Sequence, residues 1–171
     1  RDRSLSAGVD VRIVRQEVDE FSFEQLGGQL SFDGNSPVPR SVSSNPGLFV
    51  ELQDTSIDGL TLTSGARVDI VSNEMLADAQ QLAALGTRDP EASLAEILGT
   101  GDFDQSFGLW SAFINGEFQA DDNWAIQFAA GHGQRAPSLT EMYAAESFMF
   151  LLQSGLNTVT GDSRLNPERR W

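Results

Sequence analysis

Apolar and polar residues alternate one by one along five segments of the chain, which cover residues 5–13, 48–53, 60–70, 110–119 and 124–131. In the clearest segment, one set of alternate positions is Leu60, Leu62, Ser64, Ala66, Val68 and Ile70, and the other is Thr61, Thr63, Gly65, Arg67 and Asp69. Successive side chains of a β-strand point to opposite faces. Each segment therefore predicts a strand with one apolar and one polar face.

The gaps between these segments alternate between long and short. Residues 21–46, 72–105 and 134 onward form long gaps, and the first of them is rich in Gly, Ser, Asn and Pro and is interpreted as a loop. Residues 54–59 and 120–123 form tight turns. In an antiparallel meander every second connection lies on the same side, so the short turns share one side and the long loops the other. Outer-membrane barrels have this asymmetry, whereas compact soluble domains seldom have loops of such length.

The middle gap is predicted to contain helix. Asp89 suits an N-cap, Pro90 the first helical position and Gly99 the position after the last turn. An apolar stripe lies between them and consists of Ala92, Leu94, Ala95, Ile97 and Leu98. A second short helix is predicted upstream from Met75, Leu76, Ala79, Leu82 and Ala83. We interpret this segment as an ordered loop that packs on itself rather than as a partner-binding helix.

The two faces of each strand suit two different solvents. A charge finds no partner in lipid, so Arg67 and Asp69 are expected to face a watery lumen and the larger apolar residues to face lipid. Trp124, beside a short turn, suits the periplasmic aromatic girdle, and Trp110, near a long loop, suits the outer one. The alternative is that these tryptophans anchor a soluble core. Five strands cannot close a barrel, which takes about eight at minimum.

The composition permits this fold and excludes several others. The chain has 171 residues, a net charge of −14, a pI near 4.2 and no cysteine. The absence of cysteine excludes disulfides and thiolate metal sites, and the acidic balance argues against nucleic acid as a partner. The longest apolar run, residues 148–152, is far shorter than the roughly 20 residues of a membrane-spanning helix. Because the chain begins with Arg1 and carries no signal peptide, we expect a fragment or a processed chain.

The sequence offers no pattern of catalytic residues. There is no Gly-rich phosphate loop, no His-Glu-x-x-His motif and no Gly-x-Ser-x-Gly motif. We therefore expect no enzyme activity, no catalytic residues, no resident metal and no cofactor. His132, the single histidine, together with Met142 and Met149, could suggest a role in copper handling, because thioethers are soft ligands for Cu(I). The favoured interpretation is a histidine at a strand end and methionines that pack within loops.

Two motifs near the end of the chain resemble those of the TonB-dependent outer-membrane receptors. The first contains Arg135, Ala136, Pro137, Ser138, Leu139, Glu141 and Tyr143, and the second contains Leu165, Pro167 and Glu168. The resemblance extends over residues from about 48 to the end, and more weakly over the first strand, with departures at Gln134, Met142 and residues 161–163. Pro137 cannot donate to a strand ladder and marks a strand end. We expect the motifs to be strand-end structure rather than ligand contacts, and the ligand-binding residues are unknown.

The resemblance implies an all-β fold, an antiparallel up-and-down transmembrane β-barrel of the cell outer membrane. Residues 1–171 would be a partial barrel domain of about five strands from a roughly 22-stranded barrel, with long, partly helical extracellular loops. The N-terminal plug and the remaining strands would lie outside this sequence. The implied function is active transport of a scarce nutrient, energised by the TonB complex through the missing N-terminal region. The implied partners are an extracellular small-molecule or metal-chelate ligand and outer-membrane lipid. A ferric siderophore is the favoured cargo. The alternatives are copper or cobalamin as cargo, a passive porin-like channel, and a soluble β-sandwich adhesion module.

Overall fold

A computed structural model shows one antiparallel sheet in which the six strands follow one another in chain order. It describes residues 2–76, 92, 95–96, 99–145 and 160–171, with the backbone alone at residues 22, 24, 26 and 31–35. The strands are β1 (Arg3–Leu26), β2 (Gln29–Ile57), β3 (Leu60–Met75), β4 (Gln105–Asp121), β5 (Trp124–Arg135) and β6 (Glu168–Arg170), and one short helix, α3 (Leu139–Tyr143), follows β5. The predicted meander is confirmed, because every strand pairs with its neighbour in sequence.

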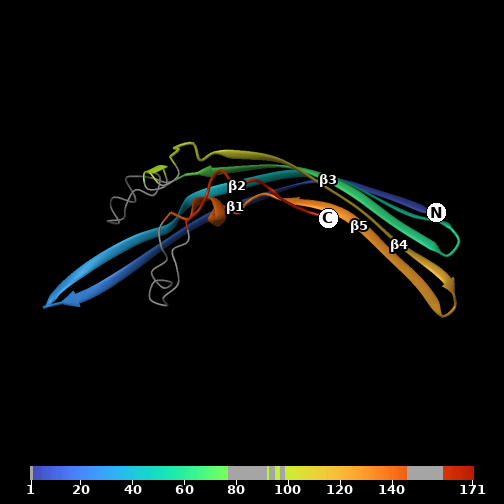
Figure 1. Cartoon of the computed structure of the whole chain (residues 1–171), viewed down its shortest axis with the longest axis horizontal. Helices are drawn as coiled ribbons and strands as arrows, with labels where there is room; N and C mark the ends of the chain where they lie inside the picture. The colour runs from blue at the N-terminus through green and yellow to red at the C-terminus, as the bar shows by residue number, and fades with distance from the viewer. Residues whose placement is uncertain (1, 77–91, 93–94, 97–98, 146–159) are drawn as a thin grey trace.

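The connections segregate to the two ends of the sheet as the sequence predicted. The turns at residues 58–59 and 122–123 lie together at the end where the chain begins, on the right of Figure 1. Gly59 has a positive φ of 73°, which only glycine adopts freely. In the second turn, the Asp121 carboxylate accepts hydrogen bonds from the backbone N–H groups of Asn123 and Trp124. The connections β1–β2, β3–β4 and β5–β6 start from the opposite end.

The interpretation of residues 21–46 as a loop was wrong. β1 and β2 continue as a two-stranded ribbon to a tight turn at Gly27 and Gly28, whose φ angles are 60° and 84°. β2 pairs with β3 only as far as Ser41, opposite Met75, so Pro37 and Pro39 lie beyond that strand ladder, where the Pro37 carbonyl accepts the Ala145 N–H at 3.0 Å. Proline is tolerated there because no ladder hydrogen bond is lost. The register with β1 also shifts between Gln16 and Glu20, beside the two prolines.

The predicted apolar face is confirmed and is largely exposed. Its large side chains include Leu5, Val9, Val11, Ile13, Leu48, Val50, Val68, Ile70, Trp110, Ile114, Phe118, Ile126 and Phe128. The cross-strand register places these residues opposite one another, as in the pairs Val9–Leu48 and Val68–Trp110. A soluble sheet would bury such a face against a second layer. Among the described residues nothing covers it, which is the arrangement that lipid allows.

The apolar band crosses the strands obliquely. The hydrogen-bonded row through Leu5 passes Leu52, Ser64 and Ile114 and reaches β5 at Ala130. On β5, however, the apolar face begins six residues earlier, at Trp124. The edge of the band shifts along the strands by six residues of about 3.3 Å each while it crosses four strand spacings of about 4.8 Å each. The strands are therefore tilted by about 45° from the normal to the band. Transmembrane strands tilt by about 35–45°. The band therefore has the slant expected of a bilayer.

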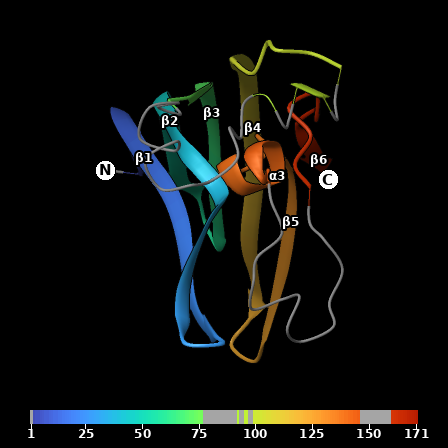
Figure 2. The same ribbon diagram turned by 90° about the vertical axis from the view of Figure 1, so that its left-hand side faces the viewer.

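The opposite face is concave, and α3 lies against it. Figure 2 shows the helix within the curve of the sheet, with β4 behind it and β2 and β5 on either side. Gln16 on β1 donates a hydrogen bond to the Thr140 hydroxyl at 2.7 Å, which ties the helix to this face. Phe103, Leu139, Met142, Tyr143 and Ala145 form a buried apolar cluster there. The curvature makes this the interior face of a barrel wall.

The predicted helices lie mostly outside the described residues. Of the first helix, Ala92, Ala95 and Glu96 are helical. Gly99 has a φ of 67°, and its N–H donates to the Ala95 carbonyl at 2.9 Å, as expected after a last helical turn. The second prediction was wrong at Met75, which ends β3, and at Leu76, which follows the strand and is not helical. The other positions named for these helices, residues 79, 82, 83, 89, 90, 94, 97 and 98, are not described. No helix within the described part of the chain is long and apolar enough to cross a membrane.

Candidate functional site on the concave face

The first family motif folds into a strand end followed by a capped helix. Pro137 ends the extended segment, and Ser138 caps α3 by accepting a hydrogen bond from the Glu141 N–H at 3.3 Å. The Glu141 carboxylate accepts the Ser138 N–H at 2.7 Å, which completes a reciprocal capping box. Leu139 points into the buried cluster. The Ser-x-x-Glu spacing predicts this capping box, although the sequence interpretation did not use it.

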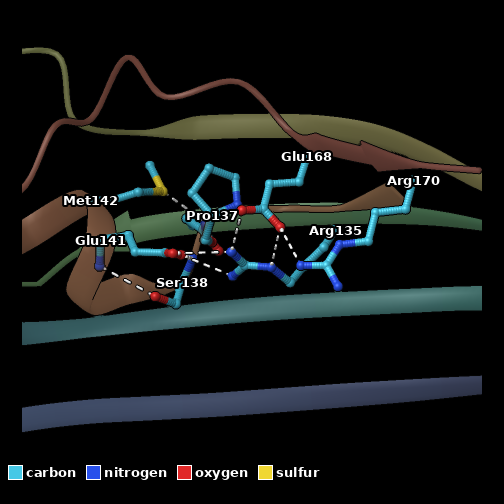
Figure 3. Close-up of polar contacts among 8 residues, drawn as sticks. Arg135, Pro137, Ser138, Glu141, Met142, Glu168 and Arg170 are labelled. Carbon is cyan, nitrogen blue, oxygen red and sulfur yellow. Dashed lines mark hydrogen bonds and ion pairs between the residues drawn. The ribbon is translucent and has the colours of Figure 1, made fainter. Parts of the chain in front are cut away.

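Arg135 joins the two motifs. Its guanidinium donates to both oxygens of Glu141 at 2.9 and 3.0 Å, and it also contacts Glu168 of the second motif at 3.3 Å (Figure 3). These hydrogen bonds from Arg135, with those from Ser138, lower the pKa of Glu141 to about 2. The planar guanidinium group, with its forked N–H donors, is well suited to bind carboxylates. The motif residues therefore meet in space although 33 positions separate Arg135 from Glu168.

The backbone of the second motif packs against the end of the helix. The Gly161 N–H donates to the Ala144 carbonyl at 2.7 Å, and the Asp162 N–H donates to the Glu141 carbonyl at 2.9 Å. A Cβ atom at Gly161 would lie only 2.5 Å from the Met142 carbonyl group. This close approach explains why a glycine stands at this position. Leu165, by contrast, is 39% exposed and lies outside the buried cluster.

The buried side of α3 is also held by polar contacts. The Tyr143 hydroxyl donates to the Phe103 carbonyl at 2.8 Å, and burial raises the pKa of Tyr143. Asn73 on β3 donates to the Met142 sulfur at 3.0 Å and to the Pro137 carbonyl at 3.3 Å. Asn73 and Phe103 were missed by the sequence interpretation, because no local pattern links them to residues some 40 to 70 positions away.

A hollow of about 590 Å³ opens between this helix and the barrel wall. Its far side carries Arg67 of β3, which contacts Asp10 of β1 and Asp69 at 2.6 Å each. Its near side is formed by Arg135, Ser138 and neighbouring residues. The expected placement of Arg67 and Asp69 on the interior face is confirmed. The hollow offers charged and hydroxyl groups to a polar solute.

The structure does not bring the suggested copper ligands together. Met142 is fully buried on the concave face, and its sulfur faces Asn73. His132 shares the convex face of β5 with Ile126 and Phe128, opposite the face where Met142 lies. Its ring lies between those of Trp110 and Trp171. Met149 lies outside the described residues. Within the part of the chain that is described, no three His, Cys, Asp or Glu side chains gather as metal ligands.

Comparison with known proteins gives a family and a fold. The family model for "TonB dependent receptor-like, beta-barrel" matches residues 3–171. Among solved structures, the copper transporter OprC superimposes with a TM-score of 0.63 at 17% sequence identity. The match covers 99% of this chain and 24% of that one, so the chain spans about a quarter of the length of this structural relative. At that identity the likeness extends to the fold alone. No curated protein matches the chain.

Proposed function

Because the chain belongs to the TonB-dependent receptor family of β-barrels, we propose that it forms part of the wall of an outer-membrane transporter. In this proposal the barrel takes up a scarce nutrient with energy delivered by the TonB complex. The TonB contact and the plug would belong to a region upstream of residue 1. The barrel moves its cargo and carries out no covalent chemistry. Family membership is the observation that carries the proposal.

The size and the polar lining of the hollow on the concave face favour a polar cargo that is larger than a bare ion. The hollow beneath α3 has room for a small molecule and is bordered by Arg67, Asp69, Arg135 and Ser138. Their hydrogen-bonding groups suit a solute that carries its own polar periphery. We therefore propose a metal chelate, with a ferric siderophore as the first candidate and cobalamin as a further one.

Copper is the second candidate cargo, and it is favoured by a single observation. The structural relative with a TM-score of 0.63 is named a copper transporter. Against it, Met142 faces Asn73 rather than the hollow, and His132 lies on the other face of the sheet. A soft thioether and imidazole set of the kind that Cu(I) prefers is not assembled among the described residues. For this reason the chelate is the preferred cargo.

Uptake by the whole receptor tests the proposal. Cells that express it would be given radiolabelled ferric siderophore, cobalamin or copper, in matched strains with and without TonB. We expect uptake of one cargo that stops when TonB or the proton gradient is removed. Equal uptake in both strains would mean a passive porin-like channel, the alternative function. A receptor that extracts from cells without detergent would instead indicate a soluble module.

A further inference from the structure

Three glycines of the barrel wall lie directly opposite a phenylalanine of the next strand in the chain. The cross-strand pairs are Gly8–Phe49 between β1 and β2, Gly65–Phe113 between β3 and β4, and Gly116–Phe128 between β4 and β5. An added Cβ atom would lie 2.8 Å from the Phe49 ring at Gly8 and 2.5 Å from the Phe113 ring at Gly65, and it would overlap the Phe128 ring at Gly116. Each ring therefore lies in a space that only glycine leaves free.

The first two pairs lie on the concave face, among polar side chains. Phe49 lies opposite Arg67, and Phe113 lies opposite Gly65, so both rings belong to the polar set of alternate positions. Phe49 is 36% exposed and Phe113 is 41% exposed. A glycine leaves the backbone of its strand open to water, and a ring that lies over the glycine covers that backbone. The contact with glycine thus accounts for two apolar side chains on a water-facing surface.

The alternation of apolar and polar residues does not by itself fix the register of neighbouring strands. A slip of one residue would turn the apolar face toward water, but a slip of two residues keeps every side chain on its own face. In hairpins the turn fixes the register, and β2–β3 and β4–β5 are joined by short turns. β3 and β4 are joined by the long connection of residues 76–104. Their register must therefore be set by the strands themselves.

The Gly65–Phe113 pair distinguishes the native register of β3 and β4 from a slip of two residues. Such a slip would place Phe113 opposite Thr63 or Arg67, which flank Gly65 on the same face. Either residue carries a Cβ atom where the ring now lies, so the ring would have to turn away. The backbone at Gly65 would lose its cover at the same time. Both effects favour the native register, because cross-strand side-chain pairs contribute to the stability of a sheet.

We propose that the Gly65–Phe113 pair sets the register in which β3 and β4 join when the barrel folds. The ring fits opposite a residue without a Cβ atom, and Gly65 is the single glycine of β3. The Gly8–Phe49 pair does the same for β1 and β2, whose ladder is separated from its turn by two register shifts. The inference concerns the assembly of the barrel wall and does not depend on the cargo.

Disulfide trapping in the full-length receptor measures this register. Cysteines introduced at positions 63 and 115 face each other in the native register, whereas those at 63 and 117, or at 61 and 115, come opposite each other only after a slip of two residues. In Phe113→Ala the ratio of slipped to native disulfide should rise about tenfold, which corresponds to about 1.4 kcal/mol. Phe107→Ala is the matched control and should leave the ratio unchanged, because Phe107 lies on the same face of β4 but opposite Val71. Only receptor that migrates as a heat-resistant barrel on unboiled gels would be analysed, so that unfolded chains do not contribute.

Glycine variants test the contact from the other strand. Gly65→Ala should lower the heat-resistant fraction, whereas Gly108→Ala on β4 should not, because a Cβ atom there meets no other atom within 4 Å. In the Phe113→Ala background, Gly65→Ala should cause little further loss, since the ring that it collides with is gone. Native disulfide alone in Phe113→Ala would overturn the proposal, and so would an equal slip in Phe107→Ala. Equal losses in Gly65→Ala and Gly108→Ala would also overturn it, because the effect would then not come from the ring.

Discussion

Replacing Arg135 by glutamine should loosen α3 from the second motif without opening the sheet. The side chain of Arg135 is 51% exposed, and those of Glu141 and Glu168 are 43% and 51% exposed. Exposed ion pairs contribute about 0.2–1 kcal/mol each. Two pairs, one of them bidentate, give a total of about 1–2 kcal/mol. A loss of this size changes a local opening equilibrium by a factor of about 5–30.

Hydrogen exchange measures this opening directly. The N–H groups of Met142, Ala144 and Gly161 donate to carbonyls within the junction and are protected only while it is closed. In Arg135→Gln, peptides that cover residues 138–145 and 160–168 should exchange about 5–30 times faster. Peptides from β3 and β4 should exchange as in the wild type. Their hydrogen bonds belong to the sheet and do not depend on Arg135.

Arg164→Gln is the control for this experiment. Arg164 pairs with Asp162 at 3.0 Å, two residues away in the same turn, and touches no other motif residue by a described ion pair. The Arg164→Gln substitution removes the same charge from the same region. Its effect on residues 138–145 should be small, because Arg164 does not link α3 to the second motif. Unchanged exchange in Arg135→Gln would refute the reasoning. So would equal acceleration in both variants, because the effect would then come from net charge alone.

Three further outcomes are expected. Leu62→Arg should cost about 2–4 kcal/mol near the bilayer midplane, whereas Thr63→Arg on the lumen face should cost much less; the heat-resistant fraction on unboiled gels compares them. Gly161→Ala should speed exchange of the α3 amides, because a Cβ 2.5 Å from the Met142 carbonyl costs about 1–3 kcal/mol of overpacking. The pKa of Glu141 is depressed to about 2, so its contribution is present above its usual value of 4.5 and is lost as pH falls from 4.5 towards 2; junction exchange, corrected for the intrinsic pH dependence, should accelerate there.

The strands and their order could be predicted because they depend on local alternation. In residues 60–70, the large apolar side chains share the convex face with Ser64, and Thr61, Thr63, Arg67 and Asp69 share the concave face, as a period of two requires. The two short turns were also visible, since Asp58-Gly59 and Asp122-Asn123 are typical turn residues. Most of the strands of the barrel wall could therefore be predicted from the periodicity of the sequence.

Residues 21–46 were misread because their Gly, Ser, Asn and Pro content outweighed their pairing. Turn residues usually mark loops, but Pro37 and Pro39 lie in a part of β2 that pairs with β1 and extends beyond the ladder with β3. Whether a proline can stay in a strand depends on which edge is free, and that is set by the length of β3. The length of β3 cannot be inferred from the residues of β2.

The candidate site was only partly accessible for a similar reason. The residues of the first motif are close in sequence, and their capping box could have been read from Ser138 and Glu141. The contacts from Arg135 to Glu168 and from Asn73 to Met142 join distant segments. They depend on how the sheet curves around α3, which no local pattern states.

The central claim is that the convex apolar face meets lipid and the concave face meets water. The described chain has no cysteine, so single cysteines can be introduced from residue 60 to residue 71 of the full-length receptor and spin-labelled in bilayers. We predict that accessibility to oxygen, which dissolves in lipid, alternates with a period of two and peaks at the even positions. Accessibility to a water-soluble nickel complex should peak at the odd positions. A profile without alternation, or one with water access on both faces, would contradict the account.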